Sequence, residues 1–154
     1  MIKTIFDVLN SKKLTISVAE SITGGALSKK LISLAGSSSF FKGSVVTYSD
    51  ESKIEILKIE KEKIRKHSAV SQQIAGLMAS NVKNLFNSDI GFSTTGNAGP
   101  GLNDEKSNLG DLYISFHFKN KTKTKFFKLE GNRDANINKA VKVSLEFISE
   151  NLDK

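Results

Sequence analysis

The sequence contains no cysteine, which excludes disulfide bonds and thiolate metal sites. No segment approaches the roughly 18 consecutive apolar residues that a membrane-spanning helix needs. Residues 1–7 also lack the uninterrupted apolar stretch and cleavage site of a secretory signal peptide. At 154 residues the chain is long enough to bury a core without crosslinks, so we expect one domain, residues 1–154, in a soluble, cytoplasmic protein.

Arginine is scarce, because Arg65 and Arg133 are the only two among 23 basic residues. The formal net charge of +7 nevertheless raises nucleic acid as a partner. Against this, the lysines are scattered along the chain, and the densest basic run, residues 119–125, is typical of a hairpin turn with exposed strand ends. Without an arginine cluster or a groove-reading motif, we expect no nucleic-acid binding.

Helical and strand-like patterns alternate along the chain. Helices are predicted over residues 2–12, 26–34, 51–57, from an N-cap at Ser71 to about 86, and over 134–151, with the charged segment 58–66 as a solvated helical turn. Strands are predicted over residues 14–18, 40–48, 89–95, 112–118 and 123–129. The last two strands suit an antiparallel hairpin. The order predicts an α/β protein, a three-layer α/β/α sandwich with a mixed sheet.

Ser21 stands at the point where the first predicted strand ends and the second predicted helix begins. The residues that follow it, Thr23, Gly24 and Gly25, supply small, flexible backbone and the N–H groups of a first helical turn. Such N–H groups are suited to bind an oxyanion that develops during acyl transfer. A second strand-to-helix junction carries Tyr48 five residues before Lys53. A serine, a tyrosine and a lysine at such junctions can build a nucleophilic site without histidine or cysteine.

A lysine acts as a base only in its neutral form, which at an ordinary pKa near 10.4 is about one molecule in 2,500 at pH 7. Lys53 would therefore need a lowered pKa. Partial burial would lower it, and a nearby cation such as Arg133 would add to the effect. A pKa of roughly 8 would raise the neutral fraction to about a tenth. Lys53 could then take the proton of Ser21 and return it to a leaving group, directly or through Tyr48.

Each of these residues also has an ordinary structural interpretation. Ser21 alone would be a helix cap, Lys53 a solvated helix lysine, Tyr48 a half-buried strand aromatic, and Arg133 a surface residue at a helix start. Glu20 is interpreted as a packing or capping residue. His67 and His117, the only histidines, lack metal-ligand spacing, so no metal is predicted.

Several motifs in order resemble one known family. They are Ala-Glu-Ser-x-Thr-Gly-Gly at 19–25, Gly-Ser-Ser at 36–38, Val-Thr-Tyr-Ser at 46–49 with Lys53, Ala-Val-Ser at 69–71, and Thr-Gly-x-Ala-Gly-Pro at 95–100. Together they resemble the C-terminal domain of CinA, the nicotinamide-nucleotide amidohydrolase or nicotinamide mononucleotide deamidase family. The resemblance runs from about residue 14 to residue 135.

The resemblance implies hydrolysis of the carboxamide of nicotinamide mononucleotide to nicotinic acid mononucleotide and ammonia, in pyridine-nucleotide recycling. It implies Ser21 as nucleophile, Lys53 as its basic partner and Tyr48 as an assisting hydroxyl, and no cofactor. Thr95, Gly96 and Arg133 match positions that the family uses around the ligand, Arg133 either as a clamp on the substrate phosphate or as a charge that tunes Lys53. Thr23, Gly24 and Gly25 are expected beside the substrate, and a homodimer is implied by analogy.

The chain departs from the family pattern at two places. Ile137 and Asn138 stand where relatives usually carry a second arginine, and residues 101–110 lack the second proline common there. An alternative function is a catalytically inactive, regulatory module that binds a pyridine nucleotide.

Overall fold

The computed structural model describes residues 1–152, so the last two residues of the predicted domain 1–154 lie outside the described part. Five strands form one sheet in the order β2-β1-β3-β4-β5. They are β1 (Ile16–Glu20), β2 (Phe41–Val46), β3 (Ile90–Gly96), β4 (Asp111–Phe118) and β5 (Lys121–Lys128). β1 pairs in parallel with β2 and β3, whereas β4 and β5 pair antiparallel. The predicted mixed sheet is confirmed.

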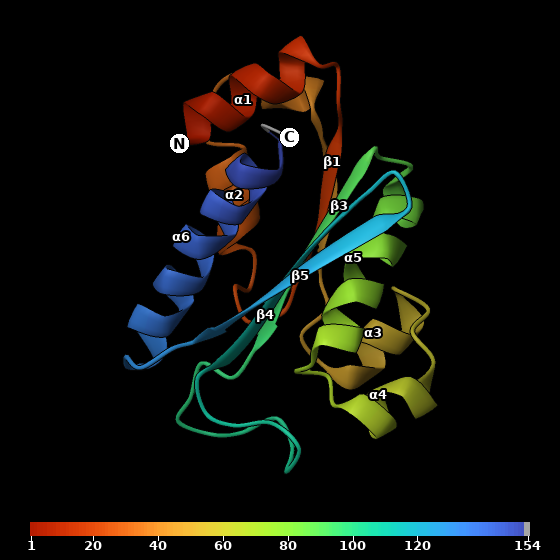
Figure 1. The fold of residues 1–154 in the computed structure, drawn as a ribbon, viewed down its shortest axis with the longest axis vertical. Helices are drawn as coiled ribbons and strands as arrows, with labels where there is room; N and C mark the ends of the chain where they lie inside the picture. Colours follow the sequence, from red (N-terminus) through yellow and green to blue (C-terminus); the bar gives the residue numbers. More distant parts are fainter. Residues whose placement is uncertain (153–154) are drawn as a thin grey trace.

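Helices cover both faces of this sheet (Figure 1). One face carries α1 (Ile2–Ser11), α2 (Ala26–Leu31) and α6 (Arg133–Leu152), and the other carries α3 (Asp50–Glu55), α4 (Lys61–His67) and α5 (Gln72–Phe86). The three-layer α/β/α sandwich predicted from the sequence is therefore confirmed. Within residues 1–152 no helix combines the length and apolar character needed to cross a membrane.

Several element ends differ from the sequence prediction by a few residues, and local hydrogen bonds explain two of them. The strand predicted over residues 14–18 begins only at Ile16, because the Leu14 N–H donates to the Leu9 carbonyl (2.9 Å) and closes α1. The helix predicted to residue 34 ends at Leu31, because the Ser37 hydroxyl binds the carbonyls of Leu31 (3.3 Å) and Leu34 (2.6 Å). Side-chain competition for helix carbonyls terminates α2 early.

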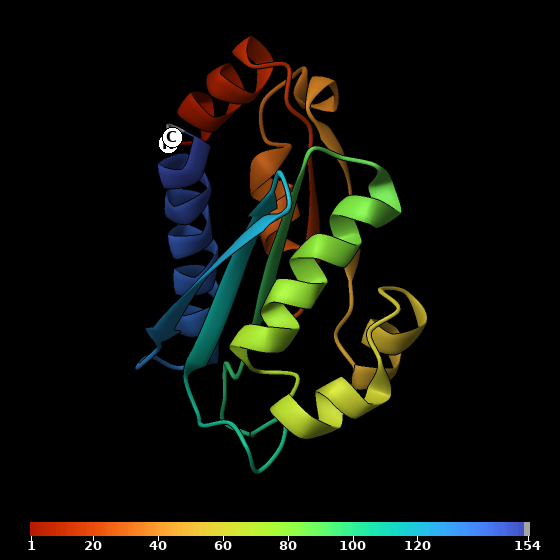
Figure 2. The ribbon, with the colours of Figure 1, turned by 45° about the vertical axis from the view of Figure 1, so that its right-hand side comes forward.

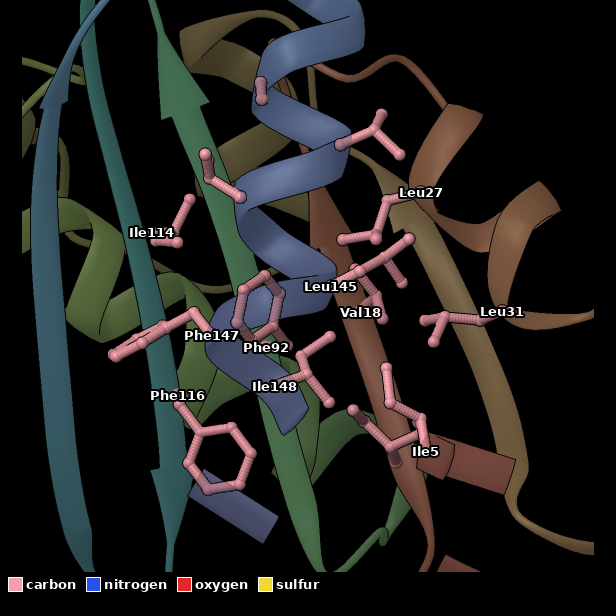
Figure 3. Packing of buried hydrophobic residues seen from close by; sticks show 14 of the residues in the cluster. Ile5, Val18, Leu27, Leu31, Phe92, Ile114, Phe116, Leu145, Phe147 and Ile148 are labelled. Atoms are coloured by element: carbon pink, nitrogen blue, oxygen red, sulfur yellow. The ribbon is translucent and has the colours of Figure 1, made fainter. Parts of the chain in front are cut away.

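Large apolar side chains fill the space between the sheet and α6 (Figure 3). Phe92 of β3 meets Phe147 of α6 edge to face, with ring centroids 6.4 Å apart. The other face holds a smaller cluster under α5, and it includes Ile64 of α4. The charged segment 58–66, expected to be a solvated turn, is thus anchored by two buried side chains, Ile59 and Ile64.

α5 crosses one face of the central strands (Figure 2). Small residues, Ser17, Gly91 and Ser93, lie on these strands at the contact with the helix. Ser17 and Ser93 are fully buried there, and their hydroxyls donate to the α5 carbonyls of Val82 (3.1 Å) and Ala75 (2.6 Å). Gly91 lies directly beneath the helix, and a Cβ at this position would overlap the Ala79 carbonyl oxygen. The small residues at these positions therefore allow α5 to pack closely on the sheet.

The carboxyl ends of β1, β2 and β3 meet at one end of the sheet, with Glu20 paired to both Val46 and Thr94. From β1 the chain crosses one face through α2 to β2, then crosses the other face through α3, α4 and α5 to β3. β1 is therefore a topological switch point, the place where open α/β sheets bind ligands.

The close packing of α5 predicts a large cost for one added methyl group. Gly91→Ala should lower the free energy of unfolding by about 1–3 kcal/mol, because α5 must move away from β3. Gly76→Ala in α5 is the matched control: its Cβ would make an ordinary 3.5 Å contact with Thr122, so it should be neutral or stabilise by up to about 1 kcal/mol. Urea denaturation measures both, and a Gly91→Ala variant as stable as the wild type would contradict this packing.

Candidate active site

The turn from β1 into α2 is held by the buried carboxylate of Glu20. Its Oε2 accepts hydrogen bonds from the N–H groups of Gly25 (2.9 Å) and Leu27 (3.1 Å). Its Oε1 accepts from the Ser28 N–H (2.8 Å) and the Ser28 hydroxyl. A carboxylate at the N-terminal end of a helix satisfies N–H groups that have no partner within the helix. Glu20 therefore caps α2, in agreement with the capping interpretation.

The residues expected beside the substrate at this turn face the protein instead. The Gly24 N–H donates to the Ser21 carbonyl (3.1 Å), and the Gly25 N–H is taken by Glu20. The Thr23 hydroxyl pairs with that of Thr94 (2.8 Å). The Gly24 and Gly25 N–H groups, which were expected to bind an oxyanion, thus both have acceptors within the protein. Residues 23–25 build the turn that presents Ser21 and do not line the cavity beside it.

Ser21 and Lys53, 32 residues apart, meet at the end of β1. Lys53 Nζ lies 3.3 Å from Ser21 Oγ and donates to the Thr47 carbonyl at 2.8 Å. The lysine comes from α3, whose first turn is fixed by a capping box between Ser49 and Ser52. Only 1% of Lys53 is exposed, so the solvated-lysine interpretation is wrong. At this distance a proton can pass from the Ser21 hydroxyl to the Lys53 amine when the amine is neutral.

Burial lowers the pKa of Lys53 from 10.5 to about 8, while the Asp50 carboxylate opposes this by favouring the charged form. The lowered pKa that a basic role of Lys53 requires is therefore present. The expected contribution of Arg133 is not among its causes. At pH 7 about a tenth of Lys53 is therefore neutral.

A cavity of about 460 Å³ opens over this pair. It brings together six residues predicted from the sequence: Ser21, Tyr48, Lys53, Thr95, Gly96 and Arg133. The rest of its lining comes from Ile22, Ala69, Val70 and residues 97–103. Within residues 1–152 no group of three or more His, Asp or Glu side chains is arranged to hold a metal ion.

Tyr48 and Arg133 bond to each other at the rim of the cavity. Arg133 Nη2 donates to the Tyr48 hydroxyl oxygen (2.7 Å), and Nη1 donates to the Gly99 carbonyl (2.8 Å). Tyr48 follows the end of β2 and is 56% exposed, so the half-buried strand interpretation is wrong. Because its oxygen accepts from a cation, the phenol proton is left to be donated into the cavity.

The wall of the cavity formed by the glycine-rich residues 97–103 is organised by Asn97. Asn97 occupies the variable position of the Thr-Gly-x-Ala-Gly-Pro motif and was not predicted from the sequence. Its side-chain amide donates to the Ser107 hydroxyl (2.8 Å) and the Asn108 carbonyl (3.0 Å). Its Oδ1 accepts from the Asn103 N–H (3.1 Å). Asn97 is buried, and these three bonds satisfy its side chain, as burial requires. The signal available in the sequence was an asparagine within a glycine-rich segment.

Two further bonds tie this wall to the rest of the fold. The Thr95 hydroxyl donates to the Ala69 carbonyl (2.8 Å), which joins the end of β3 to the segment before α5. Asn136 of α6 donates to the Ala98 carbonyl (3.0 Å). Thr95 thus lines the cavity and helps to hold its wall in place.

A second cavity, of about 530 Å³, lies at the opposite end of the sheet. Its lysines include Lys12 and Lys123, which bond to the Leu152 carbonyl and to Asn151 Oδ1 (2.9 Å). Cations at the C-terminal end of a helix are stabilising, so these two lysines have a structural role at the end of α6.

Known proteins resemble this chain over nearly its whole length. A CinA-like protein of Flavobacterium psychrophilum is 40% identical over 141 residues, which are 92% of this chain and 34% of that protein. A CinA-like protein of Petrotoga mobilis is 47% identical over 113 residues, 73% of this chain and 28% of that protein. The chain thus spans about a third of the length of these curated relatives.

A solved structure agrees with the fold. The competence damage-inducible protein A of Klebsiella pneumoniae superposes with a TM-score of 0.95 at 31% identity, covering 99% of this chain and 94% of that one. The family described as the CinA C-terminal domain matches residues 1–152, the whole described part. With the switch-point cavity, the motifs around it and these matches in agreement, the chain belongs to the CinA C-terminal domain family.

Proposed function

We propose that this protein hydrolyses the carboxamide of nicotinamide mononucleotide, giving nicotinic acid mononucleotide and ammonia. The observation that carries the proposal is the 3.3 Å contact between Ser21 Oγ and a fully buried Lys53 Nζ at the base of an open cavity. The resemblance of the motifs to the nicotinamide-nucleotide amidohydrolases supplies the substrate. The capped turn presents Ser21, and the buried lysine is the base that can activate its hydroxyl as a nucleophile.

Acylation begins when neutral Lys53 takes the proton of Ser21 as Oγ attacks the carboxamide carbon. The carbonyl oxygen becomes an oxyanion, and Lys53 holds the proton as an ammonium that also donates to the Thr47 carbonyl. That proton passes to the amide nitrogen, the C–N bond breaks, and ammonia leaves an ester on Ser21. Neutral Lys53 then takes a proton from water as that water attacks the ester. It returns the proton to Ser21 Oγ as the C–O bond breaks, and the acid product loses its own proton to solvent and leaves as the carboxylate.

The Tyr48 hydroxyl is the donor that we assign to the oxyanion. Its oxygen is fixed by Arg133 Nη2, and its proton is left for an acceptor in the cavity. This assignment replaces the helix N–H groups of Gly24 and Gly25, which have acceptors in the protein. Losing one such donor typically costs about 3 kcal/mol in the barrier.

Arg133 is suited to bind the phosphate of the nucleotide. It lies exposed at the cavity rim and keeps guanidinium N–H groups beyond the two that bond to Tyr48 and Gly99. The cavity volume of about 460 Å³ falls within the range of small-molecule sites.

Removing either member of the pair should abolish turnover. Ser21→Ala and Lys53→Met should each lower kcat about 10³-fold or more, since the two groups act as a unit. Exposed Ser33→Ala and Lys66→Met are the matched controls and should leave kcat unchanged. Ammonia release and the mass shift of the nucleotide measure the reaction. Full activity of either site variant would contradict the mechanism, and nucleotide binding without turnover by the wild type would favour the inactive-module alternative.

Activity should rise with pH until Lys53 is neutral. Because burial sets the pKa of Lys53 to about 8, kcat/KM should increase about fivefold between pH 7 and pH 8 and level off above that range. The profile should be taken above pH 7, where the substrate phosphate, with a second pKa near 6, is already dianionic. A flat or falling profile between pH 7 and pH 8 would rule out Lys53 as the base.

A further inference from the structure

The proton held by Lys53 has few groups to stabilise it. Within hydrogen-bond reach its Nζ has the Ser21 hydroxyl and the Thr47 carbonyl, both neutral. A buried ammonium with only neutral acceptors pays a large desolvation cost. Yet the proposed reaction forms this ammonium during each attack and must hold it until the leaving group takes the proton. An anion near Lys53 would lower the cost of that state.

Asp50 is placed to supply the anion. It is the first residue of α3, and Lys53 lies three residues later, so the two side chains share one helix face. Asp50 Oδ1 is buried and has no hydrogen-bond partner in the described part of the chain. Thr47 Oγ1, from the residue whose carbonyl binds Lys53, is likewise buried without a partner. The segment that holds Lys53 thus carries two buried polar oxygens that no other described group binds.

Other charged groups on neighbouring elements are directed elsewhere. Glu20 at the end of β1 is saturated by four donors at the start of α2. Glu51 on α3 is exposed. Glu60, just before α4, is exposed and pairs with Lys63 (2.9 Å). Arg133 of α6 bonds to Tyr48 and Gly99 at the rim. Asp50 is thus the carboxylate that acts on Lys53, and it favours the charged amine.

We propose that Asp50 is a positioning residue that stabilises the protonated form of Lys53 between attack on the substrate and departure of ammonia. The inference rests on the proposed function for its catalytic meaning, but the electrostatic link between the two side chains stands independently. Burial makes the lysine a base at neutral pH, and Asp50 keeps that base strong enough to take the serine proton. The two opposing effects together set the pKa near 8.

Direct titration of Lys53 tests the link without any turnover. Protein labelled with ¹³Cε-lysine is titrated by NMR, and the Lys53 signal is assigned by its loss in Lys53→Met. In Asp50→Asn, which keeps the size and the helix position, the pKa of Lys53 should fall below the wild-type value. Glu51→Gln removes the same charge from the next, exposed position of α3 and should leave the Lys53 titration unchanged. An Asp50→Asn pKa equal to or above that of the wild type would overturn the inference, and so would an equal fall in Glu51→Gln.

The pH profile of activity separates the two proposals. If the wild type turns over the nucleotide, the rising limb of kcat/KM in Asp50→Asn should move to lower pH, in the same direction as the NMR titration. An unmoved limb would overturn the role of Asp50 while the amidohydrolase activity stands. A wild type without turnover but with the predicted NMR result would refute the proposed function and leave the electrostatic link intact.

Discussion

The contact between a buried amine and a serine hydroxyl is the interaction on which the site depends. Lys53 reaches Ser21 because the parallel pairing of β1 and β2 continues one residue past the end of β2, where the Thr47 N–H donates to the Glu20 carbonyl (2.8 Å). That bond aligns the two strand-to-helix junctions. The capping box of α3 then turns the chain so that Lys53 points back under Ser21. Two local turns and one strand register therefore produce the pair.

Burial of Lys53 lowers the stability of the folded protein, and the same burial lowers the pKa of its amine so that it can act as a base. The change in its pKa from 10.5 to about 8 corresponds to about 3 kcal/mol of free energy at neutral pH, a large share of the stability of a small domain. Since no nearby group fully offsets the desolvation of the amine, the folded state is less stable by this amount. Sites that trade stability for reactivity in this way are common among enzymes. The Glu20 cap and the close packing of α5 on Gly91 belong to the rigid frame that tolerates it.

Much of this arrangement follows from sequence patterns, and the remainder depends on three-dimensional competition for hydrogen bonds. Alternating patterns predicted the sandwich, and the two junctions predicted Ser21 with Lys53. Sequence could not tell that Glu20 takes the Gly25 N–H, because a free helix start and a capped one have the same residues. It also missed Asn97 and Asp50, whose importance comes from burial. The resemblance to a family carried the substrate, which neither periodicity nor spacing encodes.

The central claim is that Lys53 is held buried at a cost in order to be a neutral base, and unfolding as a function of pH tests it most directly. Lys53 has a folded pKa of about 8, below its unfolded 10.5, so the wild type should gain stability as pH rises from 8 to 10.5. Lys53→Met lacks this titration and should be more stable than the wild type by up to about 3 kcal/mol at pH 7, with the gap closing toward pH 10.5. A variant that is less stable at pH 7, or a difference independent of pH, would contradict the account.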